Sequence, residues 1–251
     1  MCGVVVSNTT RFPPPHRQRV KEFPPCKSSW IPKGKPRNTM KSALLILLPL
    51  VLAADASKPH PHQGVIPAFK GAPPATELTN HEIGEYHAGR GVLKQMTAGT
   101  GGQGVAVFKV NAPAKDVWSV ILDHPQYPAW IDDLKKTEIY KREDNLVFTH
   151  FLTSVMGVTV EWYIRHVVNT KAGWVTWTLD YDRLSDLDDS VGFWRVTPAR
   201  KNPNICRVEY SVNLRLQGWV PGFLKKILVD QGLEDATTWV KAQSEARFKK
   251  K

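Results

Sequence analysis

The sequence has few cysteines and no arrangement of cysteines that could hold a domain together. Three occur in 251 residues, and only Cys206 lies in the body of the chain, while Cys2 and Cys26 lie near its start. A single cysteine in the body excludes a disulfide framework there, and the absence of any Cys-x-x-Cys pair excludes the common zinc patterns. Because Cys206 stands in an alternating apolar run, we expect an inert, packed thiol.

The sequence also lacks the motifs that mark common catalytic centres. No serine stands in a nucleophile-elbow motif, and the one glycine-rich stretch, residues 97–104, precedes the alternating run VAVFKVNA. A phosphate-binding loop needs a helix N-terminus directly after its glycines, so we expect this stretch to form a flexible turn. The sequence therefore predicts no catalytic residue and no cofactor.

Metal-binding patterns are weak. Asp186, Asp188 and Asp189 cluster together but lack the ligand spacing and the closing glutamate of a calcium loop, which predicts a solvated turn. His60 and His62 have the spacing of a weak chelate, yet they lie in a proline-rich polar segment, which favours a linker. We therefore predict no metal site.

The positive charge is unevenly distributed. The formal net charge is +11, of which residues 1–39 supply +7 through eight Lys/Arg and one Glu. Residues 40–56 are neutral, so the remaining residues 57–251 carry only +4. A mildly basic body needs no polyanionic partner, and we expect no nucleic acid among its partners.

A targeting segment is predicted near the N-terminus. Lys41 is followed by an apolar stretch over residues 43–54 and by small side chains at Ala54 and Ala56. This layout is typical of a secretory signal peptide, here residues 40–56 starting at Met40, and it predicts a protein of the secretory pathway or the extracellular space. The stretch is shorter than the ~20 residues of a membrane span.

Residues 1–39 precede this segment and are basic and proline-rich. Two interpretations remain open for them. Translation starts at Met40 and the upstream residues are an artefact of the gene model, or the residues form a genuine disordered leader that targets an organelle. Residues 57–75 are rich in Pro, Gly and His and predict a disordered linker.

The pattern of a folded α+β domain covers residues 76–251. Thr79 or Asn80 can cap a short helix, and residues 112–130 predict a helix followed by a second short turn around Pro128. Five or six alternating segments separated by short turns then follow, which favours antiparallel neighbours. The last predicted element is a long helix from about Pro221, with an apolar stripe at Val229, Leu233, Ala236 and Val240.

Three stretches carry a resemblance to a known family. They are VNAPAKDVWSVILDHPQYPAWI, DLDDSVGFWRVTP and GWVPGFL…ATTWVK. Residues 76–251 resemble the START and polyketide-cyclase superfamily (SRPBCC), in particular its START-like lipid-binding or coenzyme Q-binding branch. The resemblance implies a helix-grip fold, in which a curved antiparallel sheet wraps around a long C-terminal helix and two short helices follow the first strand.

The resemblance also implies a cavity between sheet and helix, for which we expect roughly 300–1,000 Å³. Large flat rings suit its wall because they supply area with few rotatable bonds. The alternative is that these rings fill a solid core. The predicted ligand-binding residues are Trp130, Trp162, His166, Trp177, Trp194, Tyr210 and Trp239, with Trp130 and Trp239 at the mouth. We expect His166, Arg195 or Tyr210 to hold a polar head group.

The favoured function is binding, or transfer, of a hydrophobic small molecule such as a lipid, a sterol or an isoprenoid quinone. We expect a monomer that contacts membranes transiently and has no catalytic activity. The alternative is a cyclase or dehydratase acting on an aromatic or polyketide-like substrate, for which His150 and His166 are the predicted acid–base pair. A third reading, an RNA-contacting member of the superfamily, is disfavoured by the signal peptide.

Overall fold

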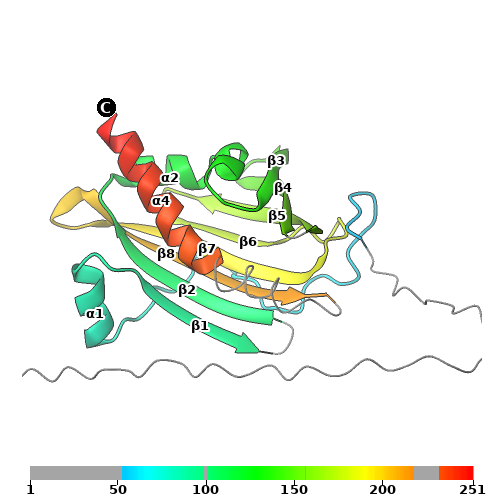
Figure 1. Ribbon diagram of the computed structural model, residues 1–251, viewed down its shortest axis with the longest axis horizontal. Coiled ribbons are helices and arrows are strands. Elements are labelled where there is room, and N and C mark those ends of the chain that lie inside the picture. The colour runs from blue at the N-terminus through cyan, green and yellow to red at the C-terminus, as the bar shows by residue number, and fades with distance from the viewer. Residues whose placement is uncertain (1–52, 99–100, 156, 218–231, 251) are drawn as a thin grey trace, which may run out of the picture. The chain divides into compact units, whose positions relative to one another are not determined.

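The computed structural model describes residues 53–98, 101–155, 157–217 and 232–250 (Figure 1). The eight strands form one antiparallel sheet in the order β1-β2-β8-β7-β6-β5-β4-β3. The strands are β1 (Val92–Ala98), β2 (Gly101–Val110), β3 (Leu134–Glu143), β4 (Leu146–Val155), β5 (Val158–Asn169), β6 (Trp174–Leu179), β7 (Leu187–Ala199) and β8 (Asn202–Leu216).

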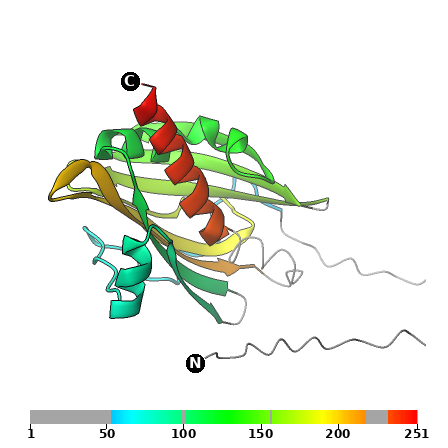
Figure 2. The same ribbon diagram turned by 60° about the vertical axis from the view of Figure 1, so that its left-hand side comes forward.

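Within the described residues, four helices accompany the sheet: α1 (Asn80–His87), α2 (Ala114–Ile121), the 3-10 helix η1 (His124–Ala129) and α4 (Gly232–Lys249). The predicted cap of α1 is confirmed, because Thr79 and Glu82 form a reciprocal capping box. Figure 2 shows α4 lying across one side of the curved sheet, with α2 and η1 beside it. This is the predicted α+β helix-grip fold.

The alternating strands decide which side chains meet α4. In β8 the even-numbered residues Cys206, Val208, Val212 and Leu214 are buried in the same core cluster as Val240 of α4. Cys206 is a fully buried free thiol, and burial raises its pKa to about 11. The expectation of an inert thiol agrees with both observations.

The glycine-rich stretch is part of the sheet and not a flexible turn over its described portion. Residues 101–104 begin β2 and pair with both β1 and β8. A Cβ atom on Gly104 would lie 3.0 Å from Leu233 Cδ1, so the missing side chain gives α4 room to approach the sheet. The predicted helix start near Pro221, and Val229 of the predicted stripe, lie outside the described residues.

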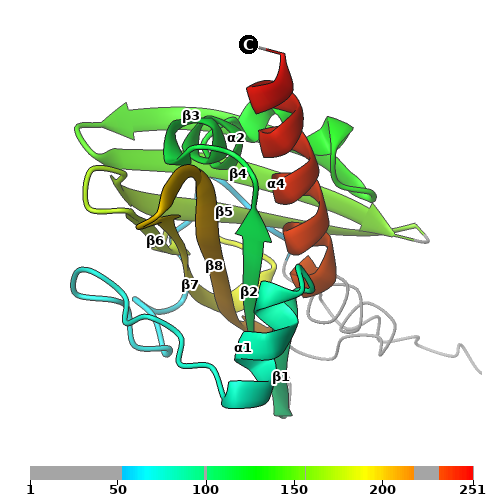
Figure 3. The same cartoon turned by 90° about the vertical axis from the view of Figure 1, so that its left-hand side faces the viewer.

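The prediction of a disordered linker over residues 57–75 is wrong. Residues 53–76, here called the strap, follow a defined course on the side of the sheet away from α4 (Figure 3). The strap pairs with the body through a bridge between Asp55 and Leu184 and through the ring contact of Phe69 with Phe193. Its low apolar content predicted disorder, but polar anchors on the sheet replace the apolar contacts.

These anchors are charged side chains that point outward from β7 and β8. Asp189 accepts hydrogen bonds from the backbone N–H groups of Val65 and Ile66, both at 2.7 Å. Glu209, only 1% exposed, accepts from the N–H of Thr76 at 2.7 Å. The strap therefore covers a face of the sheet that alternation alone predicts to be wet.

Candidate functional site

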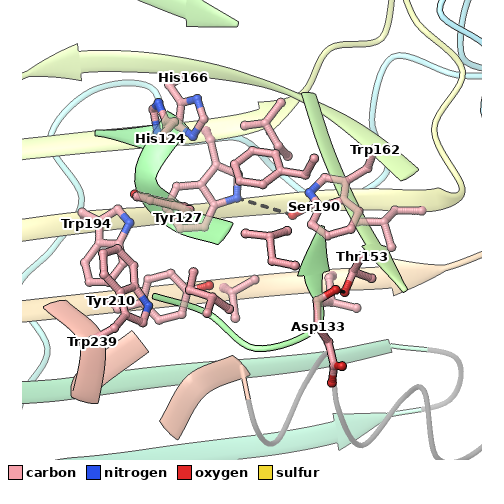
Figure 4. A pocket seen from close by; sticks show the side chains of 18 of the residues that line it. His124, Tyr127, Asp133, Thr153, Trp162, His166, Ser190, Trp194, Tyr210 and Trp239 are labelled. Atoms are coloured by element: carbon pink, nitrogen blue, oxygen red, sulfur yellow. Dashed lines mark hydrogen bonds between the residues drawn. The ribbon is translucent and has the colours of Figure 1, made fainter. Parts of the chain in front are cut away.

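A cavity of about 230 Å³ lies between the sheet and α4 (Figure 4). It is smaller than the predicted range, because bulky rings occupy much of the space between the two layers. Its wall is mostly apolar and includes residues of every strand from β3 to β8. The lining residues are His124, Tyr127, Ile131, Asp132, Asp133, Leu134, Phe151, Thr153, Trp162, Ile164, His166, Trp177, Leu187, Ser190, Trp194, Tyr210, Val212, Leu214 and Trp239.

The structure brings six of the seven predicted site residues to this cavity, namely Trp162, His166, Trp177, Trp194, Tyr210 and Trp239. The seventh, Trp130, does not line it. Its ring stacks on that of Trp239 with the centroids 5.7 Å apart, and the Arg247 guanidinium lies 5.4 Å from the Trp130 ring centroid. Trp130 thus supports a wall residue from behind.

A single glycine allows the densest part of the aromatic wall. A Cβ atom on Gly192 would lie 2.2 Å from Trp177 Cζ2 and 2.2 Å from the Ser211 carbonyl oxygen. The Trp177 ring therefore rests directly on the β7 backbone and stacks on Tyr210 at 5.7 Å. Tyr210 in turn contacts Trp194 at 4.4 Å, which makes one continuous ring surface across three strands.

Two histidines close one end of the cavity. The rings of His124 and His166 stack with their centroids 4.7 Å apart, and both are buried. His166 Nδ1 lies 3.2 Å from the Val147 carbonyl oxygen, so Nδ1 carries the proton and Nε2 keeps a lone pair. Burial lowers the pKa of His166 to about 4, and burial next to His166 lowers that of His124 well below its usual value.

The predicted pairing of His150 with His166 is wrong. In the β4–β5 register Val147 faces His166 and His150 faces Tyr163, so the two histidines point to opposite faces. His150 stacks on Tyr163 at 4.9 Å, and its Nε2 lies 2.7 Å from Glu161 Oε1. The histidine that does meet His166 is His124, which sequence reasoning missed.

Arg195 is not a head-group residue. It points away from the cavity and donates to the Pro73 carbonyl oxygen of the strap at 2.7 Å. The polar groups that do line the cavity include Ser190, Tyr210 and His166. Ser190 Oγ accepts a hydrogen bond from Trp177 Nε1 at 3.4 Å, drawn as the dashed line in Figure 4. Burial raises the pKa of Tyr210, so its hydroxyl stays protonated.

The loop after η1 lines the cavity where it reaches the surface, because Asp132 in this loop is exposed. Asp132, Asp133 and Leu134 line it there. Asp133 has a positive φ of 62°, and its carbonyl oxygen accepts from Thr153 Oγ1 at 2.8 Å and from the Ser154 N–H at 3.0 Å. These two bonds fix the loop to β4 and set the shape of the opening.

Fold and cavity together define a helix-grip protein with an internal apolar pocket, and sequence comparison gives the family. Residues 110–238, just over half of the chain, match the family described as polyketide cyclase / dehydrase and lipid transport. The chain belongs to this family. Its members include hydrophobic-ligand carriers and cyclases, so membership alone does not separate the two activities.

Several solved structures are similar to this chain at low sequence identity. The STAR-related lipid transfer protein from Xanthomonas axonopodis is 16% identical over 61% of this chain and 93% of its own, with a TM-score of 0.49. The Zhui aromatase/cyclase from Streptomyces sp. R1128 is 16% identical over 63% of this chain and 90% of its own, with a TM-score of 0.41. Comparison with curated proteins gives no significant match.

The leader and most of the predicted signal peptide, residues 1–52, lie outside the described part of the chain. Among the residues that the structure describes, no helix combines the length and the hydrophobicity needed to cross a membrane.

Proposed function

We propose that this protein binds a compact, uncharged hydrophobic molecule in the cavity under α4. The observation that carries the proposal is the hollow itself. Protein interiors are close-packed and rarely leave voids larger than a water molecule, so a cavity of about 230 Å³ walled by rings suits a ligand. An apolar cavity of ~150 Å³ accommodates benzene, which sets the scale here at roughly one to two rings.

The charge of the cavity wall supports an uncharged ligand. No lysine or arginine is among the described residues that line it, and the acidic Asp132 and Asp133 stand at its mouth. A buried carboxylate or phosphate without a cationic partner costs several kcal/mol of desolvation. A quinone, an alcohol or a ketone avoids this cost and can bond to the polar groups of Ser190, Tyr210 and His166.

Calorimetric titration with a matched pair of probes tests the proposal. We expect 2-naphthol to bind at least 10-fold more tightly than 2-naphthoate, which has the same rings and a carboxylate. Val212→Phe, which places a larger side chain in the cavity wall, is expected to abolish binding. Trp174→Phe is the matched control, because Trp174 is not among the lining residues. Equal or tighter binding of 2-naphthoate would contradict an uncharged ligand.

The stacked histidines support a second candidate function, an enzyme of the cyclase or dehydratase type. Two imidazoles with lowered pKa values are neutral at pH 7 and can accept a proton from a bound substrate. His124→Gln and His166→Gln separate the two functions. Gln keeps a hydrogen-bonding group at each position, so in a carrier both variants are expected to leave 2-naphthol binding within a few-fold. In an enzyme they are expected to abolish turnover of a polyketide-like substrate, because an amide cannot accept the proton.

We further propose that the protein is a secreted monomer that contacts membranes transiently to exchange its ligand. The support is the signal-like segment over residues 40–56 and the apolar cavity beneath a helix. N-terminal sequencing of the protein from its own host tests the first part, with Ser57 as the expected first residue. Cleavage before Ser57 removes Asp55 and its bridge to Leu184, and the strap is then held by its contacts from His60 onward. A start at Met1 would instead favour the basic leader as a targeting segment for an organelle.

A further inference from the structure

Two histidines of the strap meet an aspartate of β7. One ring nitrogen each of His60 and His62 and one carboxylate oxygen of Asp188 all lie within 4.8 Å of one another. The ring centroids of the histidines are 4.7 Å apart and perpendicular. None of the three residues lines the apolar cavity, so this cluster is separate from the proposed ligand site.

The backbone around the cluster is held in place by the fold. A register shift between Leu187 and Asp189 interrupts β7, so that Asp188 and Asp189 both contact the strap although they are consecutive. The backbone N–H of His60 donates to the Tyr181 carbonyl oxygen at 2.9 Å. Backbone hydrogen bonds at His60 and at Val65 therefore hold this part of the strap, so the two histidine side chains lie together without an ion.

His60 presents an unsatisfied nitrogen. The residue is 4% exposed, and its Nε2 donates to the Asp188 carbonyl oxygen at 2.8 Å, which leaves the lone pair on Nδ1. That Nδ1 is buried and has no hydrogen-bond partner. A backbone carbonyl behind one ring nitrogen is the usual support for a histidine that binds metal through the other.

Asp188 and His62 are spaced as two ligands of one ion. His62 Nε2 lies 3.2 Å from Asp188 Oδ1, and two donors bound at ~2.0–2.1 Å in a tetrahedral zinc site stand about 3.3 Å apart. Arg215 Nε lies 3.1 Å from the other oxygen, Oδ2, so Oδ1 remains for an ion. Coordination through His62 Nε2 requires the ring proton to move to Nδ1. Nδ1 then no longer accepts the hydrogen bond from the Gly64 N–H, and the loss of this one hydrogen bond costs little.

We propose that His60, His62 and Asp188 bind a divalent transition-metal ion, Zn²⁺ in the first instance, which fastens the strap to β7. Imidazole nitrogens favour zinc and its transition-metal neighbours over Mg²⁺ and Ca²⁺, which prefer all-oxygen sites. Three protein ligands leave a fourth position for water. The two histidines come from the strap and the carboxylate comes from the sheet. An ion bound by all three would therefore link the strap to the sheet, which is a structural role.

The first test is calorimetric titration of the chelator-treated full chain with ZnSO₄ at pH 7.5. We expect one saturable site that is weakened at least 10-fold by His62→Gln and by Asp188→Asn, while MgCl₂ gives no binding. His81→Gln, on the exposed face of α1, is the matched control and is expected to leave the affinity unchanged. Cys2 and Cys26 are present in every variant, so any zinc that they bind is common to all.

The second test reports on the strap. Zn²⁺ is expected to raise the melting temperature of the wild type and to slow hydrogen exchange at the Val65 and Ile66 amides, and to do neither in His62→Gln. His62 is partly exposed, so this variant is expected to fold, and Asp188→Asn serves if it does not. The proposal is overturned by an absence of zinc binding, or by zinc binding that is equal in the wild type and in both variants.

Discussion

The two faces of β7 and β8 are both buried, but one carries aromatic side chains and the other carries carboxylates. Toward α4, Trp194 and Tyr210 surround a hollow in which burial keeps His166 and the Tyr210 hydroxyl neutral. On the other side, Asp189 and Glu209 are as deeply buried, yet the strap supplies N–H groups to both. A buried face can therefore be apolar and unfilled or charged and fully hydrogen-bonded, within a single pair of strands.

The largest loss of stability is expected when one carbon atom is added on the face toward α4. Gly192→Ala places a Cβ within 2.2 Å of both the Ser211 carbonyl and Trp177, so we expect a loss of about 3 kcal/mol in the free energy of unfolding. Urea denaturation measures it. Gly84→Ala, which meets no atom within 4 Å in α1, is the control and is expected to gain up to ~1 kcal/mol. A Gly192→Ala variant as stable as the wild type would contradict the packing of Trp177.

Acid is expected to weaken the inner face selectively. His166 titrates at about 4 in the folded protein and at about 6.5 when unfolded. Below pH 6.5 only the unfolded chain binds the proton, so stability falls as pH drops from about 6.5 to about 4, by about 3 kcal/mol for this residue. His124 acts in the same direction. Urea titrations at pH 7 and 4.5 should show a smaller loss in His166→Gln, and an unchanged loss in the control His81→Gln.

The contacts of the outer face are weakened by a substitution that removes the charge of a side chain and keeps the shape of that side chain. Asp189 accepts from Val65, Ile66 and the Tyr181 hydroxyl, and Asp189→Asn puts an amide nitrogen against some of these donors. We expect a loss of about 2 kcal/mol and faster hydrogen exchange in the strap. Asp182→Asn, at an exposed position, is the control. Unchanged exchange at Val65 and Ile66 would show that Asp189 does not hold the strap.

The smallest expected effect concerns the support of the wall. Trp130→Ala removes the ring stacked on Trp239 and is expected to cost about 1 kcal/mol of stability. It should also speed the dissociation of 2-naphthol, measured by stopped-flow fluorescence, because Trp239 loses its backing. Trp174→Ala is the comparison variant for the dissociation rate, and equal rates in the two variants would remove Trp130 from the ligand site.

The sequence predicts which side chains share a face of the sheet, because apolar and polar residues alternate along the strands. Trp162, Trp177, Trp194 and Tyr210 all line one cavity in the structure, and period-two patterns together with a family resemblance predict the face of each strand on which they lie. His124 was not found, since it lies in a proline-rich turn that has no periodicity. The wrong choice of His150 came from the register between β4 and β5, which a one-residue slip reverses and which no local pattern specifies.

The order of the strap is not predictable from the sequence for a different reason. Its composition is that of a disordered segment, and its partners Asp189, Arg195 and Glu209 lie more than a hundred residues away in the chain. The same separation explains why Asp186, Asp188 and Asp189 have the sequence pattern of a solvated turn, although in the structure they contact the strap. Long-range polar pairing leaves no signature in a single sequence.

Most of the strap's fastenings use its peptide groups. Val65, Ile66 and Thr76 offer N–H groups, Pro73 and Thr76 offer carbonyls, and only the receiving side chains on the sheet are specific. Related chains can therefore diverge at Val65, Ile66 and Thr76 and still keep these fastenings, provided that the acidic and basic receptors survive. A search for the segment in distant relatives should begin with Asp189 and Glu209, not with the segment itself.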